Sequence, residues 1–256
     1  KARAEELNLR QAEAQPGAVQ RAREEFADAL QAAPADGYLY EGLANFLEAI
    51  NDPQGAIAAY RRLTELRPDD FYACLQIGRL LGGQGKPEQG EPFLEKAAQL
   101  CPSVPEAWHE LGVVLAAQQK YAPALECMER AAQIRPQDSS YIFSMAQMLA
   151  KLNRHSDAIE NYRRAIQTNP DFWQAHYELG GELDSQNRFP EACNEFAAAT
   201  RLNPGNSRTH FNYGVLLAKL GQFDEARHEF EETLRLEPTN QKAREYLAFV
   251  LTHQVQ

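Results

Sequence analysis

Small and large apolar residues recur along the chain with a period of 34 residues. When the repeats are started at residues 3, 37, 71, 105, 139, 173 and 207, the eighth position is small in six of them: Ala44, Gly78, Gly112, Ala146, Gly180 and Gly214. The twenty-fourth position is large in all seven: Phe26, Tyr60, Leu94, Met128, Tyr162, Phe196 and Phe230. Close-packed antiparallel helices need such pairs, because backbones approach only where a side chain is missing and the gap must be filled nearby. Each repeat is therefore predicted to be a pair of packed helices.

Turn signals keep the same period. Apart from Gln119, the fifteenth position holds residue types that tolerate the left-handed conformation in which helices end: Gly17, Asn51, Gly85, Asn153, Asn187 and Gly221. A proline stands at the thirty-second position of every repeat, from Pro34 to Pro238, where it cannot continue the second helix. The seven repeats thus predict fourteen helices, each of about 12 to 16 residues.

These positions resemble the tetratricopeptide repeat (TPR), whose pattern has an aromatic residue near position 4, Leu-Gly at 7 and 8, Ala at 20, an aromatic at 24 and Pro at 32. Trp108, Leu111, Gly112, Ala124 and Pro136 match this pattern, and the resemblance covers residues 3–240. It implies an all-α fold, a right-handed α-solenoid superhelix of about seven helix-turn-helix units. We expect one solenoid domain over residues 1–256, with these repeats: 3–36 (degenerate), 37–70, 71–104, 105–138, 139–172, 173–206 and 207–240.

The two ends of the chain depart from the pattern. In the first repeat Arg10 replaces the small residue at position 8 and Glu6 replaces the aromatic at position 4, which is expected to weaken its first helix. Residues 241–253 repeat only the first-helix half. Because solenoids need a terminal helix to cover the last apolar face, we interpret this segment as a capping helix and not as a separate functional element.

The charge balance narrows the class of partner. Lys plus Arg number 26 and Asp plus Glu number 36, so the formal net charge is −10. Nucleic acid is not an expected partner, because its binding normally requires a basic stripe. No apolar run reaches the length of a membrane span, so we expect no direct membrane insertion and a soluble region, in the cytoplasm or periplasm of a bacterial cell. The chain opens with Lys1 instead of Met, which suggests a piece of a longer protein.

Cysteine and histidine offer no catalytic, cofactor or metal site in this sequence. The four cysteines form no metal-binding pair and are expected to pack: Cys74, Cys101, Cys127 and Cys193. His176 and His210 share position 4 of adjacent repeats, but they are a whole repeat apart and no carboxylate or cysteine at matching positions completes a metal shell. We interpret both as packing residues. No Ser-His-Asp order, paired-carboxylate motif or phosphate loop supports an enzyme.

The resemblance implies a concave groove lined by the first helices, mainly through positions 2, 5, 6, 9, 12 and 13. An aromatic stripe follows position 5 through the last three repeats, and polar residues flank it. Apolar anchors beside hydrogen-bonding groups suit a bound peptide or protein segment, although these aromatics can instead pack against the adjacent repeat. The candidate groove residues are Tyr72, Gln76, Arg79, His109, Glu110, Phe143, Ser144, Gln147, Tyr177, Glu178, Arg208, Phe211 and Asn212.

The two halves of the expected groove differ in charge. Carboxylates occupy its N-terminal part, at Glu41, Glu48, Glu106 and Glu110. Basic residues lie farther along, at Lys151, Arg208, Lys219 and Lys242. Such a gradient would orient an extended ligand, with its basic residues toward the N-terminal repeats.

Two ligand classes known for the family do not fit. A chaperone-tail clamp needs lysine at position 5, which no repeat has. An asparagine-lined superhelix of the kind attached to certain glycosyltransferases needs asparagine at position 6, which only Asn8 and Asn212 provide.

We expect a non-enzymatic scaffold that binds a peptide or protein segment. Two alternatives stay open. The chain could be the substrate-presenting or regulatory arm of a larger enzyme, such as a bacterial membrane-associated transferase, or it could form a homo-oligomer through its irregular first repeat.

Overall fold

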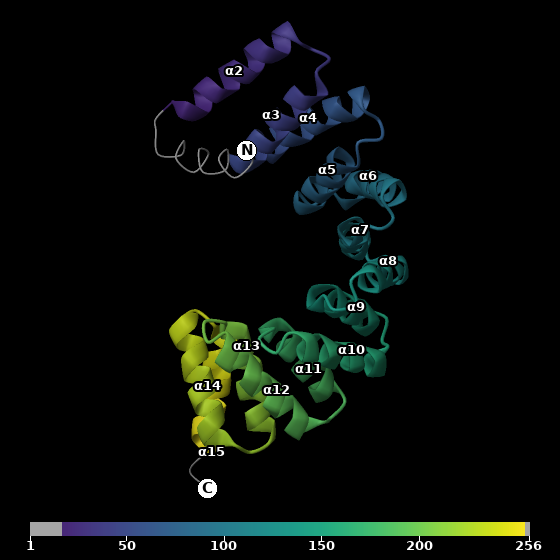
Figure 1. Cartoon of the computed structure of the whole chain (residues 1–256). Helices are drawn as coiled ribbons and strands as arrows, with labels where there is room; N and C mark the ends of the chain where they lie inside the picture. The colour runs from purple at the N-terminus through teal and green to yellow at the C-terminus, as the bar shows by residue number, and fades with distance from the viewer. Residues whose placement is uncertain (1–16, 254–256) are drawn as a thin grey trace. The chain divides into compact units, whose positions relative to one another are not determined.

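The computed structural model describes residues 17–253, and all the regular secondary structure in this range is α-helical (Figure 1). The helices are α2 (Ala18–Ala32), α3 (Gly37–Ala49), α4 (Pro53–Leu66), α5 (Phe71–Gly83), α6 (Pro87–Leu100), α7 (Pro105–Ala117), α8 (Tyr121–Ile134), α9 (Ser139–Lys151), α10 (His155–Thr168), α11 (Trp173–Ser185), α12 (Phe189–Leu202), α13 (Ser207–Lys219), α14 (Phe223–Leu236) and α15 (Gln241–His253). The first helix expected for repeat 3–36 falls on residues 3–16, outside this range. Self-association through that repeat therefore stays a hypothesis.

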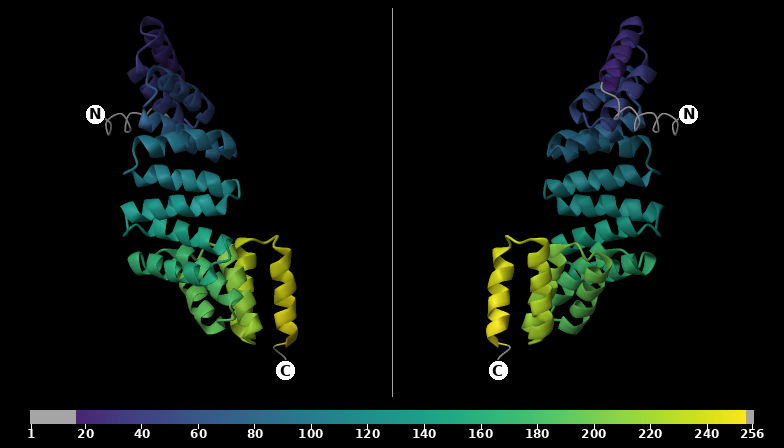
Figure 2. Two further views of the ribbon diagram at one scale, coloured as in Figure 1. Left: turned by 90° about the vertical axis from the view of Figure 1, so that its right-hand side faces the viewer. Right: turned by 90° about the vertical axis from the view of Figure 1, so that its left-hand side faces the viewer.

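The helices pair as the 34-residue period predicts. Each repeat from residue 37 onward contributes two consecutive helices, and α15 follows as a single helix packed on α14. Figure 2 shows neighbouring helices lying side by side and joined by short turns. The all-α fold and the stacking of helix pairs are confirmed. The chain divides into two compact units, residues 1–127 (the N-terminal unit) and 128–256 (the C-terminal unit), and each is described by itself.

The turns inside the repeats have the predicted geometry. Asn51, Gln119, Asn153 and Asn187 have φ between 58° and 61°, in the left-handed region. Gly17, Gly85 and Gly221 also have positive φ, so all seven residues at position 15 adopt this conformation. Gln119 does so without being glycine or asparagine. The turn geometry of the repeat therefore prevails over the local preference of that residue.

Size complementarity between positions 8 and 24 is visible in the close approach of α5 and α6. A Cβ atom added to Gly78 would lie 2.3 Å from Cγ of Leu94, which is fully buried. A Cβ added to Gly90, at position 20, would lie 2.8 Å from the carbonyl oxygen of Gly78, which is backbone and has little room to shift. The two helices meet where both lack a side chain, as the small-residue columns predicted.

Successive repeats are joined by a hydrogen bond that recurs at position 4. In four repeats, and at the equivalent position of α15, the side chain contacts the carbonyl oxygen of the proline six residues earlier, a contact we call the junction bond. The donors are Tyr40 (3.3 Å), Trp108 (3.0 Å), His176 (3.1 Å), His210 (3.1 Å) and Arg244. Because each junction bond ties the start of one repeat to the end of the preceding one, it fixes the connection between repeats.

Two junction bonds are extended by carboxylates. Nδ1 of His176 lies 2.6 Å from Glu195, and Nδ1 of His210 lies 2.6 Å from Glu229. Both ring nitrogens of each histidine thus face acceptors, an arrangement that the protonated imidazolium satisfies fully. The hydrogen bond that each histidine donates to its glutamate raises the pKa of both histidines. The sequence indicated packing roles for both histidines and no metal shell around them, and the hydrogen bonds to Glu195 and Glu229 add to the packing role.

A sequence signal for these pairs did exist. Among the six repeats from residue 37 onward, only those starting at 173 and 207 have histidine at position 4, and only these two have glutamate at position 23.

The four cysteines are free thiols, with Cys74 and Cys127 buried and the other two partly exposed. Burial raises the pKa of the Cys127 thiol to about 11, so it stays protonated at neutral pH.

Candidate functional site

The thirteen candidate residues all lie on first helices of the repeats, but they belong to two separate units. Five are on α5 and α7 of the N-terminal unit: Tyr72, Gln76, Arg79, His109 and Glu110. Eight are on α9, α11 and α13 of the C-terminal unit: Phe143, Ser144, Gln147, Tyr177, Glu178, Arg208, Phe211 and Asn212. Each group forms its own surface, so the two groups are treated as separate candidates.

In the C-terminal unit three candidate residues meet in one pocket of about 430 Å³, which we call the α9–α11–α13 pocket. Gln147, Glu178 and Arg208 line it, each from a different first helix. The remaining lining residues, which were not among the sequence candidates, are Met148, Ala150, Lys151, Tyr162 and Glu182. Tyr162 comes from the second helix α10 and is 1% exposed, so it forms the floor.

The polar groups of this pocket include a carboxylate that is not held by another side chain. Within residues 17–253, Glu178 makes no side-chain hydrogen bond, and its carboxylate oxygens are not among the buried atoms without a partner. Burial raises the pKa of Glu178, against the opposing effect of Arg208 and Lys151. The neighbouring carboxylate of Glu182 lies 2.8 Å from Nδ1 of His155. The pocket therefore offers one acceptor and two cationic donors to a ligand.

Arg208 is held at the rim by an aromatic neighbour. Its guanidinium lies over the ring of Tyr177, 5.4 Å from the ring centroid. The hydroxyl of Tyr177 in turn accepts a hydrogen bond of 2.7 Å from Nδ2 of Asn212. This cluster joins α11 to α13 and positions the guanidinium while leaving the side chain exposed.

The aromatic stripe at position 5 has a packing role. Phe143 lies 5.6 Å from Tyr162, Tyr177 lies 5.8 Å from Phe196, and Phe211 lies 5.9 Å from Phe230, measured between ring centroids. Each therefore packs on the large residue at position 24 of its own repeat. All three are only partly buried, so part of each residue remains at the surface. Their contact with a ligand stays a prediction.

In the N-terminal unit the candidate polar groups bond to one another. The hydroxyl of Tyr60 lies 2.7 Å from Oδ1 of Asn45 and 2.9 Å from Oε1 of Glu48. Arg79 donates to Glu48, and its Nε also donates to Oε1 of Gln76 at 2.7 Å. Burial, followed by the nearby Glu48, raises the pKa of Tyr60. This surface is a hydrogen-bond network that joins α3, α4 and α5.

The other N-terminal candidates lie around this network or beyond it. Tyr72 is 42% exposed and its ring stands edge-on to that of Tyr60, with 6.1 Å between centroids. His109 and Glu110 lie partly buried on the next first helix, α7. Their place in a ligand site stays a prediction.

The expected charge gradient is weaker than the sequence indicates. Lys219 is paired with Asp184, with Nζ–O distances of 2.8 and 2.9 Å. In the α9–α11–α13 pocket the two cations are matched by Glu178 and Glu182. The C-terminal surface therefore presents mixed charge, which favours a ligand with both donors and acceptors over a purely acidic one.

Comparison with known families decides the classification. Models described as tetratricopeptide repeat match residues 10–71, 71–104, 105–138, 143–207 and 207–240. The chain belongs to the tetratricopeptide repeat family. TPR repeats are typically non-catalytic, and this chain is in general terms a protein–protein interaction scaffold. No curated protein sequence gives a significant match.

Solved TPR structures resemble the chain in fold. The YrrB structure, described as a TPR protein with an unusual peptide-binding site, shares 23% identity over 73% of this chain and 96% of its own, with a TM-score of 0.58. The structure of Pseudomonas aeruginosa PilF has 17% identity over 89% of this chain and 99% of its own, with a TM-score of 0.70. MamA has 22% identity over 63% of this chain and 95% of its own, with a TM-score of 0.61.

Between residues 17 and 253, no helix is long and apolar enough to cross a membrane. In the same range, no cluster of three or more His, Cys, Asp or Glu side chains is arranged to hold a metal ion.

Proposed function

We propose that this TPR chain binds an extended peptide segment of a partner protein, and that the α9–α11–α13 pocket is the centre of the binding surface. The observation that carries the proposal is the convergence of Gln147, Glu178 and Arg208 on one pocket from three consecutive repeats. A peptide that crosses these three helices meets one polar group from each repeat.

The chemistry of the pocket suits a peptide backbone. An extended backbone presents N–H donors and C=O acceptors in alternation. The carboxylate of Glu178 can accept from an N–H group, while Arg208 and Lys151 can donate to carbonyl oxygens. The amide of Gln147 can do both. These groups would hold the backbone, and the exposed parts of the aromatic stripe would contact its side chains.

A solved relative supports a peptide as the first ligand to test. The YrrB structure is described as having a peptide-binding site, and it is similar to this chain in fold. That description concerns YrrB. Here it only ranks peptides ahead of small molecules.

The experiment must avoid the aromatic stripe, because truncation of those packing residues would disturb the fold. Peptides selected on the intact chain from a random library are measured against a variant with Gln147→Ala and Arg208→Ala. We expect its affinity to fall about tenfold or more, since two donors at the centre of the site are lost. The matched control is Gln222→Ala with Arg227→Ala, which removes the same two residue types from exposed positions at α14.

An unchanged affinity in the Gln147→Ala and Arg208→Ala variant, with the fold retained, would place the peptide elsewhere on the chain. An equal loss in the control variant would also contradict the proposal.

A further inference from the structure

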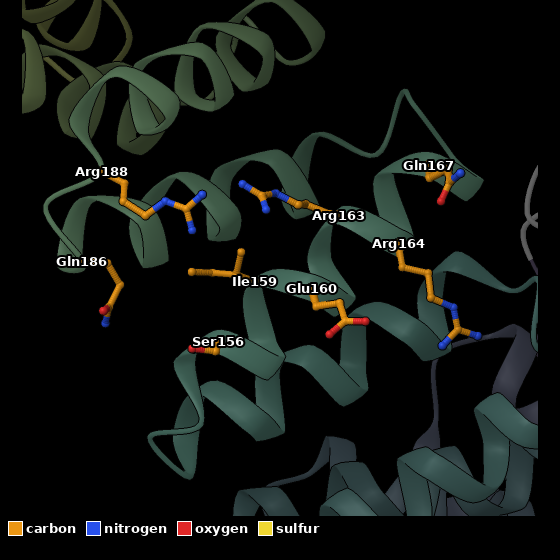
Figure 3. A pocket seen from close by; sticks show the side chains of 8 residues that line it. All are labelled: Ser156, Ile159, Glu160, Arg163, Arg164, Gln167, Gln186 and Arg188. Atoms are coloured by element: carbon orange, nitrogen blue, oxygen red, sulfur yellow. The ribbon is translucent and has the colours of Figure 1, made fainter.

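A second hollow, of about 680 Å³, lies on the C-terminal unit between α10 and the turn that leads into α12, and we call it the α10–α12 hollow. It shares no lining residue with the α9–α11–α13 pocket. Arg163 and Arg164 contribute from α10, and Arg188 from the turn before α12. In Figure 3 the guanidinium groups of Arg163 and Arg188 point toward one another across the hollow.

Two of these arginines converge on one internal carboxylate. Glu191 accepts from Nε and Nη2 of Arg188 at 2.8 and 2.7 Å, and from Nη2 of Arg163 at 2.7 Å. A guanidinium carries about five N–H donors in a fixed fork, so most of the N–H groups of Arg163 remain available for another acceptor. Glu191 thus holds the two cations side by side without using up their donors.

The charge of the hollow is opposite in sign to that of the chain. Its three arginines are opposed by Glu160 in the lining and by Glu191, which leaves one positive charge in excess. The whole chain carries a net charge of −10. A local positive excess on an acidic protein favours an anionic partner at this place.

The floor of the hollow is apolar. Ile159 lies in the lining and is 5% exposed. A glutamate side chain of a partner could lay its methylene groups on this floor and its carboxylate between the guanidiniums. Gln186 on the rim offers an amide to the adjoining peptide backbone.

We propose that the α10–α12 hollow is a second binding site, which takes the carboxylates of an acidic peptide segment of a partner protein. Arg163 and Arg188 bind the carboxylate, and Glu191 positions the two guanidiniums. The site is independent of the peptide surface on the first helices, so either can exist without the other.

The test measures the anisotropy of a fluorescein-labelled peptide of alternating Glu and Gly with the whole chain at low ionic strength. Arg163→Gln with Arg188→Gln is expected to weaken binding about tenfold or more. The matched control, Arg227→Gln with Arg235→Gln, removes the same charge from arginines that pair within α14 and is expected to change binding less than about twofold. The side chains of Arg163 and Arg188 are 48% and 39% exposed, so their substitution should leave the fold intact. Thermal unfolding of the variant checks that the fold is retained.

A second variant changes the affinity in the opposite direction. Glu191→Gln removes one of the two negative charges that offset the arginines, while its amide oxygen can still accept from both guanidiniums and keep them in place, so the acidic peptide should bind a few times more tightly. Glu231→Gln removes the same charge from the Arg227 pair and should leave the affinity nearly unchanged.

Four results would overturn the proposal. The first is no measurable binding of the acidic peptide, and the second is an equal loss of affinity in the two double-arginine variants. The third is an unchanged affinity in Glu191→Gln. The fourth is displacement of the peptide by inorganic phosphate at an ionic strength at which chloride does not displace it. The last result would mark the hollow as a site for inorganic anions.

Discussion

The N-terminal and C-terminal units build their first-helix surfaces from similar residue types but use them differently. In the N-terminal unit Arg79 donates to both Gln76 and Glu48, and Glu48 also accepts from the hydroxyl of the buried Tyr60. In the C-terminal unit Gln147 and Glu178 line a pocket and, within the described residues, make no hydrogen bond to each other. Polar groups that satisfy one another hold a surface together, whereas groups that line a pocket without bonding to each other are available to a ligand.

The largest expected effect tests whether the C-terminal aromatic stripe supports the fold. Phe211 packs on the fully buried Phe230 and on Tyr246, so Phe211→Ala should lower the free energy of unfolding by about 2–4 kcal/mol. In the N-terminal unit Tyr72 is 42% exposed, and Tyr72→Ala should cost under about 1 kcal/mol. Urea denaturation of the two variants measures both values.

Equal costs for Phe211→Ala and Tyr72→Ala would remove this part of the contrast. It would mean that both aromatic side chains support the fold to a similar degree.

A smaller effect separates the two tyrosines at position 24. Tyr60→Phe removes a hydroxyl that contacts Asn45 and Glu48, so it should destabilise the chain by about 1 kcal/mol. Tyr162→Phe removes a hydroxyl for which the described residues offer no hydrogen-bond partner, and its cost should stay within about 0.5 kcal/mol. Thermal and urea unfolding can compare the two variants. A larger cost for Tyr162→Phe would show that the pocket floor, and not the N-terminal network, depends on its hydroxyl.

The smallest expected effect is a pH dependence confined to the C-terminal unit. The pKa of His176 and of His210 is raised by hydrogen bonds to Glu195 and Glu229. Because the protonated form is favoured in the folded state, the stabilisation is fully present below the unfolded pKa of about 6.5 and is lost as the pH rises through the higher folded pKa. The junction bonds of Tyr40 and Trp108 in the N-terminal unit carry no such dependence near neutral pH.

The two tryptophans allow the pH effect to be assigned to a unit. Trp173→Phe leaves Trp108 to report unfolding of the N-terminal unit, and Trp108→Phe leaves Trp173 to report the C-terminal unit. The urea midpoint reported by Trp173 should decrease as the pH rises from about 6 to about 8. His176→Gln with His210→Gln should flatten this dependence of the midpoint on pH. A flat curve before substitution would contradict the imidazolium assignment.

The sequence predicted the features that depend on backbone geometry. The columns that contain Gly78 and Leu94 identified the close approach of paired helices, and the residue types at position 15 identified the turns inside the repeats, except at Gln119. These features follow from the 34-residue period because backbone packing admits few alternatives at such positions. Membership of the family also gave the location of the candidate surface on the first helices.

Long polar side chains were not predictable in the same way. Arg79 reaches Glu48, which is 31 residues away in the sequence. Arg163 and Arg188 share Glu191 on second helices, which a search confined to the groove positions leaves out. An arginine can extend toward several neighbours, and which one it meets depends on the packing of the adjacent repeat. The Glu partners of His176 and His210 were an exception, since their co-occurrence was visible in the sequence.

The central claim is that the C-terminal first-helix surface binds peptide and the N-terminal one does not. The most direct measurement is the affinity of a selected peptide for two matched variants, Gln147→Ala with Arg208→Ala and Gln76→Ala with Arg79→Ala, which remove the same residue types from the two units. We predict a loss of about tenfold or more in the first variant and less than about twofold in the second. An equal loss in both variants, or a loss only in the second, would contradict the claim.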